Sequence, residues 1–110
     1  MKKAVRPDIT FYLEQIPSIG REIAIDLKRI GLTKPQDLIG KNPYRLYRKL
    51  CEKDKMRYDP CMLDALTAAV HFMDGKGKKP WWTFTPLRKK QYGGSENYRR
   101  TFRRERKKRV

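Results

Sequence analysis

The hydrophobic residues of this chain recur three and four positions apart in five successive segments, which is the spacing of one helix face. Proline and glycine separate these segments. The pattern predicts helices from about Ile9 to Gln15, Arg21 to Ile30 and Lys34 to Ile39, and two more that start at Asn42-Pro43 and Asp59-Pro60. The stretch 81–84 could form a strand but has no evident partner, so the predicted fold class is all-α.

Capping signals support this division into helices. Asp8 is the expected N-cap of the first helix. Thr33 is the expected N-cap of the third, with Gln36 three residues later at the capping-box position. Asn42 and Asp59 each precede a proline, and a cap followed by proline is typical of the first turn of a helix.

Charge narrows the choice of partner. The chain holds 28 Lys and Arg against 12 Asp and Glu, a net charge of +16. Such an excess favours a polyanion, either nucleic acid or an anionic membrane surface. No segment is apolar and long enough to span a bilayer, and the N-terminus lacks the apolar core of a signal peptide. We therefore expect a cytoplasmic protein with reduced cysteines and no membrane partner.

The excess charge is concentrated near the C-terminus. Residues 88–110 hold eleven Lys or Arg and two Glu, with few apolar side chains. A segment of this composition does not bury enough surface to offset its ordering entropy. We predict a folded domain over residues 1–85 and a flexible basic tail over residues 86–110. The tail residues expected to contact nucleic acid are Arg99, Arg100, Arg103 and Arg104.

The segment Ile16-Pro17-Ser18-Ile19-Gly20, followed by Ala24, resembles the helix-hairpin-helix motif. In families with this motif, main-chain N–H groups of the hairpin contact a DNA phosphate, as helix N-termini do in general. By position, the resemblance implies contacts from Ser18, Ile19, Gly20 and Arg21. By analogy with the same families, the hairpin carbonyls could hold a monovalent cation. The chain departs from the motif in having Ser18 in place of its first glycine and Glu22 where a basic residue is frequent.

A longer resemblance is to the bacterial pathogenicity-locus family of small helix-hairpin-helix proteins. It rests on the stretches 16–38, 46–51 and 59–64 and on Trp81-Trp82, and it covers roughly Ile16 to Trp82. The order of the predicted helices, two pairs joined by a connector, agrees with a five-helix double helix-hairpin-helix (SAM-like) domain. The resemblance implies this fold and DNA binding, but no pathway.

The predicted function is therefore sequence-independent DNA binding through backbone phosphates, with no cofactor and no enzymatic activity. Arg21, Lys28 and Arg29 are expected to add charge near the hairpin. The alternatives are a protein-interaction adaptor in DNA repair or competence, and an RNA-binding protein, with DNA expected before RNA. Trp81 and Trp82 could stack on bases beside Lys78 and Lys79, although packing onto the helical core is the preferred interpretation.

Other chemistries fit the sequence poorly. Cys51, Cys61 and His71 lack the spacing and the fourth ligand of a closed zinc site, so no metal is expected. A Cys–His nucleophile would have no third group to orient it. The acidic residues of the helices are expected to be caps, helix-dipole partners or solvated side chains, namely Glu14, Glu22, Asp26, Asp64 and Asp74.

Overall fold

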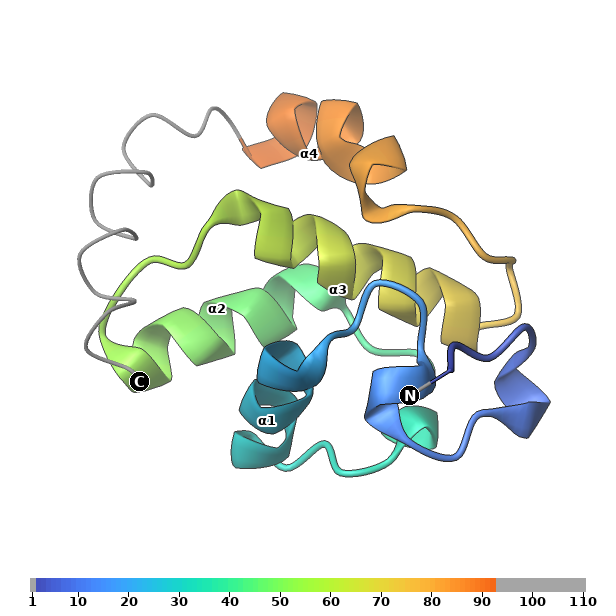
Figure 1. The fold of residues 1–110 in the computed structure, drawn as a ribbon. Coiled ribbons are helices and arrows are strands. Elements are labelled where there is room, and N and C mark those ends of the chain that lie inside the picture. The colour runs from blue at the N-terminus through green and yellow to red at the C-terminus, as the bar shows by residue number, and fades with distance from the viewer. Residues whose placement is uncertain (1, 93–110) are drawn as a thin grey trace.

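The computed structural model describes residues 2–92, and every regular element within them is helical. The α-helices are α1 (Arg21–Arg29), α2 (Pro43–Asp54), α3 (Pro60–Met73) and α4 (Thr85–Tyr92), shown in Figure 1. The short 3-10 turns are η1 (Pro7–Ile9), η2 (Leu13–Gln15), η3 (Pro35–Leu38) and η4 (Trp81–Phe84). The described residues are thus all-α, as predicted, and the stretch 81–84 is a helical turn rather than a strand.

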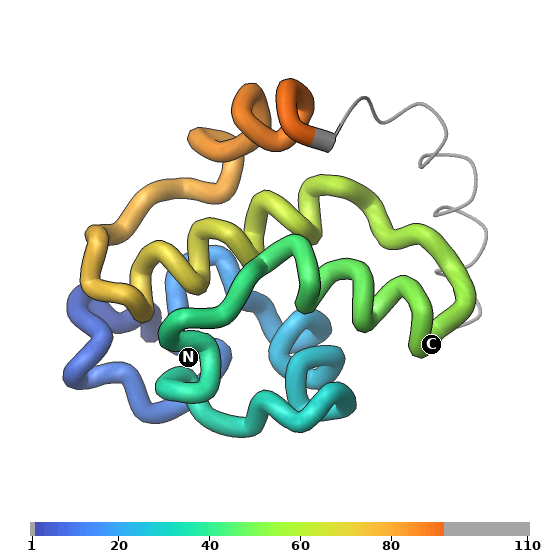
Figure 2. Tube along the Cα trace, turned by 180° about the vertical axis from the view of Figure 1, so that it is seen from behind, coloured from blue at the N-terminus to red at the C-terminus, as the bar shows by residue number. Residues whose placement is uncertain are grey.

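Helix α3 lies at the centre of the fold. It is apolar on nearly all sides, and most of its side chains are buried, as expected of a helix enclosed by others. Helix α2 packs against one side of α3, while η4 and α4 cover the opposite side (Figures 1 and 2). The leucines Leu27, Leu38, Leu50 and Leu66, from α1, η3, α2 and α3, share one core and are fully buried. Each such leucine contributes roughly 1.5–3 kcal/mol to stability.

The predicted starts of α2 and α3 are confirmed in detail. Oδ1 of Asn42 accepts hydrogen bonds from the N–H groups of Tyr44 and Arg45 at 2.9 and 3.3 Å. Oδ1 of Asp59 accepts one from the N–H of Cys61 at 2.9 Å. In each helix a proline follows the cap and occupies the first turn, where its missing N–H would have had no partner.

The predicted helix over residues 9–15 is wrong. This segment forms η1 and η2 with an extended link between them. Oε1 of Gln15 accepts from the N–H groups of Phe11 and Tyr12 at 2.8 and 2.9 Å. Oγ1 of Thr10 donates to a carbonyl four residues earlier at 2.7 Å. Because these side chains hydrogen-bond to the local backbone, they compete with a continuous helix.

Two predicted caps are also wrong. Asp8 lies inside η1 and forms an ion pair with Arg6 at 3.2 Å instead of capping a helix. At the start of η3, Oδ2 of Asp37 accepts from the N–H of Thr33 and from that of the next residue, at 3.0 and 3.1 Å. The side chain of Asp37 therefore binds the N–H groups at the start of this turn. Thr33 is not its N-cap, and Gln36 does not form the expected capping box.

Helix α4 spans the expected boundary between domain and tail at residues 85 and 86. Its residue Arg88 is only 6% exposed, so the helix packs onto the fold rather than leaving it. The remainder of the expected tail, residues 93–110, lies outside the described residues, and with it Arg99, Arg100, Arg103 and Arg104.

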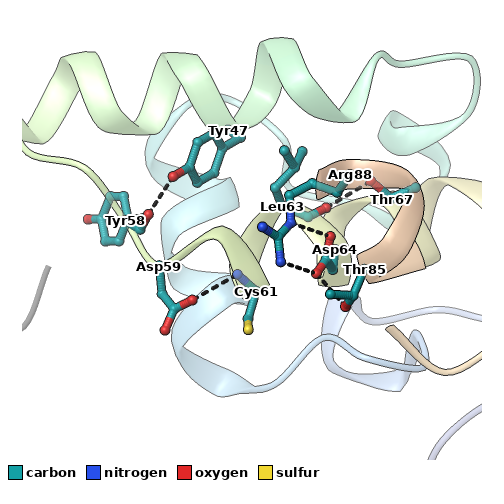
Figure 3. A network of polar contacts seen from close by, with 9 residues as sticks. All are labelled: Tyr47, Tyr58, Asp59, Cys61, Leu63, Asp64, Thr67, Thr85 and Arg88. Atoms are coloured by element: carbon teal, nitrogen blue, oxygen red, sulfur yellow. Dashed lines mark hydrogen bonds and ion pairs between the residues drawn. The ribbon is translucent and has the colours of Figure 1, made fainter. Parts of the chain in front are cut away.

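A buried polar cluster attaches α4 to α3 (Figure 3). Asp64 of α3 is 0% exposed and pairs with Nε and Nη2 of Arg88, both at 3.1 Å. Oγ1 of Thr85 donates to the same carboxylate at 2.7 Å. The expectation that Asp64 is a cap or solvated side chain is wrong, because its carboxylate is buried and pairs with Arg88, which lies 24 residues further along the chain.

Candidate nucleic-acid interface

The turn before α1, residues 16–20, carries the predicted motif. Ile16 and Ile19 are 0% exposed and fix the turn to the core. Ser18 has φ 78, in the left-handed region, which costs an L-residue about 1 kcal/mol or more. Gly20 instead has φ −91 and ψ −175, which any residue can adopt, and an added Cβ would meet nothing within 4 Å. The lack of a side chain at Gly20 therefore leaves space in front of the turn.

Behind this space lies the start of α1. Gly20 is the N-cap, and no side chain caps the first turn from that position. The N–H of Ala24 is bonded to the carbonyl of Gly20 at 3.0 Å, so the donors of residues 21–23 precede the helical ladder. The N–H of Ile19 donates to the carbonyl of Ile16 at 3.1 Å and is used within the turn. Among the predicted amides, those of Ser18, Gly20 and Arg21 remain as candidates.

A lysine from outside the motif, Lys3, binds main-chain carbonyls of the turn. Nζ of Lys3 donates to the carbonyls of Glu14, Ile16 and Ile19 at 2.7, 3.2 and 2.6 Å. Two of these carbonyls, those of Ile16 and Ile19, belong to the hairpin that by analogy could hold a monovalent cation, and they bind an ammonium group of the chain itself. Desolvation lowers the pKa of Lys3, and the charge of Glu14 acts in the opposite direction. No local pattern links Lys3 to the turn, so sequence reasoning missed it.

Two pockets of opposite character meet at this turn, and both include Ser18 and Trp81 in their walls. The larger, which we call the indole pocket, has a volume of about 500 Å³ and is lined by Lys3, Pro17, Ser18, Lys78, Lys79, Pro80, Trp81 and Trp82. The smaller, of about 260 Å³, contains the carboxylates of Glu22, Asp26 and Asp59. The pocket beside Lys78 and Lys79 is therefore basic and aromatic, whereas the pocket beside Glu22 is acidic, and Trp81 of η4 lines both.

The predicted basic residues are not all gathered at the turn. Lys78 and Lys79 lie beside Ser18 in the indole pocket, and Arg21 is exposed at the start of α1. Lys28 is exposed in the last turn of α1, about 10 Å further along the helix axis. The two indoles also differ. Trp81 is half-buried, in line with the packing interpretation, but Trp82 is 61% exposed.

The charge of Arg29 is already matched within the fold. Its Nη1 lies 3.0 Å from Asp26 and 3.2 Å from Asp54, and its Nη2 also pairs with Asp54. The hydrogen bond to Asp54 raises the pKa of Arg29. Asp26 is 2% exposed, so this carboxylate is enclosed rather than solvated as the sequence suggested. Among the described residues that were predicted to supply charge, Arg29 is thus the least suited to bind a phosphate.

Cys51 and His71 line neither pocket at the turn, whereas Cys61 lines the acidic one. Burial raises the pKa of Cys61 to about 11, so its thiol remains protonated at neutral pH. Nδ1 of His71 lies 3.2 Å from the carbonyl of Gly77, and its ring meets Phe84 edge-on. Within residues 2–92, no three His, Cys, Asp or Glu side chains are grouped to hold a metal ion. None of the helices described combines the length and the apolar character that crossing a bilayer requires.

Comparison with known proteins assigns the chain to a family. The model of the family described as "Pathogenicity locus" (Cdd1) matches residues 7–90, which run from η1 through most of α4. The mitomycin resistance protein McrB of Streptomyces lavendulae is 35% identical over 82 residues, which cover 74% of this chain and 78% of that protein. No solved structure matches the chain. The chain therefore belongs to the pathogenicity locus family.

Proposed function

We propose that this protein binds DNA without sequence preference, and that the turn at residues 16–20 with α1 acts as a helix-hairpin-helix element. The observation that carries the proposal is the uncapped start of α1 behind the open position at Gly20. Main-chain N–H groups at a helix start bind phosphate oxygens, and the helix dipole adds to their attraction. The amides of Ser18, Gly20 and Arg21 would hold one phosphate.

The surrounding charges favour one path for the bound strand. Lys3, Lys78 and Lys79 line the indole pocket on one side of Ser18. Glu22 lines the acidic pocket, where a phosphate would be repelled. We infer that the strand runs from the start of α1 toward the indole pocket. Contacts of this kind go to the backbone of the nucleic acid and read no sequence.

The turn between α2 and α3 would serve as the second hairpin of the predicted double motif. It contains no glycine, and its residue Asp59 already caps α3. Its Tyr58 is 1% exposed and accepts a hydrogen bond at its carbonyl from the hydroxyl of Tyr47 (Figure 3). These features support a structural role for the second hairpin and leave phosphate contact to the first.

Replacing Gly20 with aspartate should separate DNA binding from folding. An added side chain has room there, and an aspartate at the N-cap would accept a hydrogen bond from the N–H of Glu22 or Ile23 and put a negative charge beside the amides that would hold the phosphate. We expect affinity for a short DNA duplex to fall about 10- to 100-fold, the equivalent of losing one or two charged hydrogen bonds. The free energy of unfolding should stay the same or rise. Fluorescence anisotropy and urea unfolding measure the two effects.

The matched control is Gln91→Glu, which adds the same charge at an exposed position of α4 outside both pockets at the turn. It should lower duplex affinity less than threefold. Equal losses in the two variants would mean that only net charge matters and would contradict the proposal. Tighter binding of RNA than of duplex DNA at one salt concentration would favour the RNA-binding alternative. Salt-insensitive capture of a protein partner would favour the adaptor.

The name of the Streptomyces relative adds a biological setting to this proposal. That protein is named for mitomycin resistance, and we propose that this chain acts in resistance through its contact with DNA. Under this hypothesis, expression of the chain in a mitomycin-sensitive bacterium raises the fraction of cells that survive mitomycin. Gly20→Asp should remove this gain while the amount of expressed protein stays the same.

A further inference from the structure

The indole pocket holds an aromatic surface that the packing of the protein leaves uncovered. Trp82 is 61% exposed, although a tryptophan usually buries most of its large apolar surface. Pro17 and Pro80 stand beside it, so the pocket has rings on several sides. Its volume of about 500 Å³ falls within the range of small-ligand sites.

The two indoles are held in a fixed arrangement. Trp81 and Trp82 meet edge to face, with ring centroids 5.7 Å apart and an angle of 83° between their planes. Both belong to η4, which packs against α3, and Phe84 of the same turn meets His71 with ring centroids at 5.4 Å. Trp82 is therefore exposed to solvent but held in place by an anchored turn. The face of one indole lies beside the edge of the other.

We infer that the indole pocket takes an unpaired nucleobase of a DNA strand, stacked on Trp82, while the adjoining phosphates lie against Lys78 and Lys79. This inference rests on the proposed function, because the pocket shares Ser18 with the turn that would hold a phosphate. It extends that function from duplex backbone to a strand with at least one unpaired base, such as a gap or an overhang.

The chemistry of the pocket favours this occupant over others. A nucleotide combines a flat ring with a negative charge, and the pocket combines indoles with lysines and has no carboxylate among the described residues that line it. The neighbouring pocket, with three carboxylates, lacks this complementarity. Bases within an intact duplex have both faces covered by their neighbours, so only an unpaired or terminal base can offer a face to Trp82. An apolar peptide would leave Lys78 and Lys79 without partners.

The test uses the full-length chain and a fluorescein-labelled oligothymidylate of twelve nucleotides. Trp82→Ala should weaken binding of this strand roughly 5- to 100-fold, the usual effect of losing one stacked base. Trp82→Phe should restore part of the affinity. The matched control is Phe11→Ala, which removes an aromatic side chain that is 68% exposed and lies outside the pocket, and it should have no effect. Affinity for a circular duplex, which has neither an unpaired nor a terminal base, should change less than twofold in all three variants.

A second probe separates stacking from charge. An abasic oligomer of the same length and charge should bind the unchanged protein about as weakly as Trp82→Ala binds the oligothymidylate. Equal affinity for the abasic and the thymidine strands would overturn the inference, as would an equal loss on strand and duplex in Trp82→Ala. Failure of the proposed function looks different, because the duplex would then bind without any dependence on Gly20.

Discussion

Replacing Asp64 with alanine should lower the free energy of unfolding by about 3–5 kcal/mol. The reason is that Arg88, 6% exposed, would keep its charge inside the protein without the carboxylate that now binds two of its nitrogens at 3.1 Å. The third nitrogen, Nη1, is buried and has no hydrogen-bond partner among the described residues, so nothing nearby replaces Asp64. Urea unfolding followed by circular dichroism measures the change.

Two controls show whether the loss comes from the unpaired charge. Glu52→Ala breaks the exposed pair between Arg48 and Glu52, at 3.2 Å on one face of α2, and should cost less than about 0.5 kcal/mol. The double variant Asp64→Leu with Arg88→Met should recover most of the stability, because it removes both charges at once. A loss in Asp64→Ala no larger than in Glu52→Ala would contradict the account of how α4 is attached.

Affinity for duplex DNA should fall about 10³-fold when the salt concentration rises from 50 to 200 mM. This estimate assumes contacts to about six phosphates, since each neutralised phosphate adds about 0.9 to the slope of log affinity against log salt. The basic residues that the proposal assigns to these contacts are those around the turn and residues of the C-terminal segment 93–110, which holds eight Lys or Arg. A salt titration of the full-length protein, followed by anisotropy, measures the slope.

The same titration tests the predicted tail contacts. A full-length variant with Arg99, Arg100, Arg103 and Arg104 changed to glutamine should have a shallower slope, by up to about 0.9 for each arginine that contacts a phosphate. The hairpin contribution should survive in this variant, so Gly20→Asp should weaken its binding further. A salt slope near zero in the unchanged protein would argue against DNA binding through phosphates.

Local sequence signals were sufficient to predict α1, α2 and α3. The caps Asn42 and Asp59 and the apolar stripes behind them act within a few residues, so they can be read without tertiary information. The first predicted helix failed for an equally local reason. Gln15 and Thr10 bind nearby backbone groups, and these bonds outweigh an apolar spacing that in fact leaves Tyr12 59% exposed.

The contacts of Lys3 with the turn and the attachment of α4 both join residues that are distant in sequence. Lys3 reaches carbonyls 11 to 16 residues away, and Arg88 reaches Asp64 across 24 residues. The contact of Asp64 with a basic partner could have been inferred from the sequence. Asp64 interrupts the most apolar of the described helices, and a carboxylate in such a position requires a buried partner. The predicted phosphate-binding residues remain predictions, with Ile19 now the weakest because its amide is used in the turn.

The central claim is that main-chain amides before α1 contact a nucleic-acid backbone. The most direct test is a titration of the uniformly ¹⁵N-labelled full-length protein with a short DNA duplex, followed by amide chemical shifts. The account predicts the largest shifts at Ser18, Gly20 and Arg21, with smaller ones at Lys78 and Lys79. Silence across residues 17–21, while amides elsewhere in the chain respond to the duplex, would contradict it.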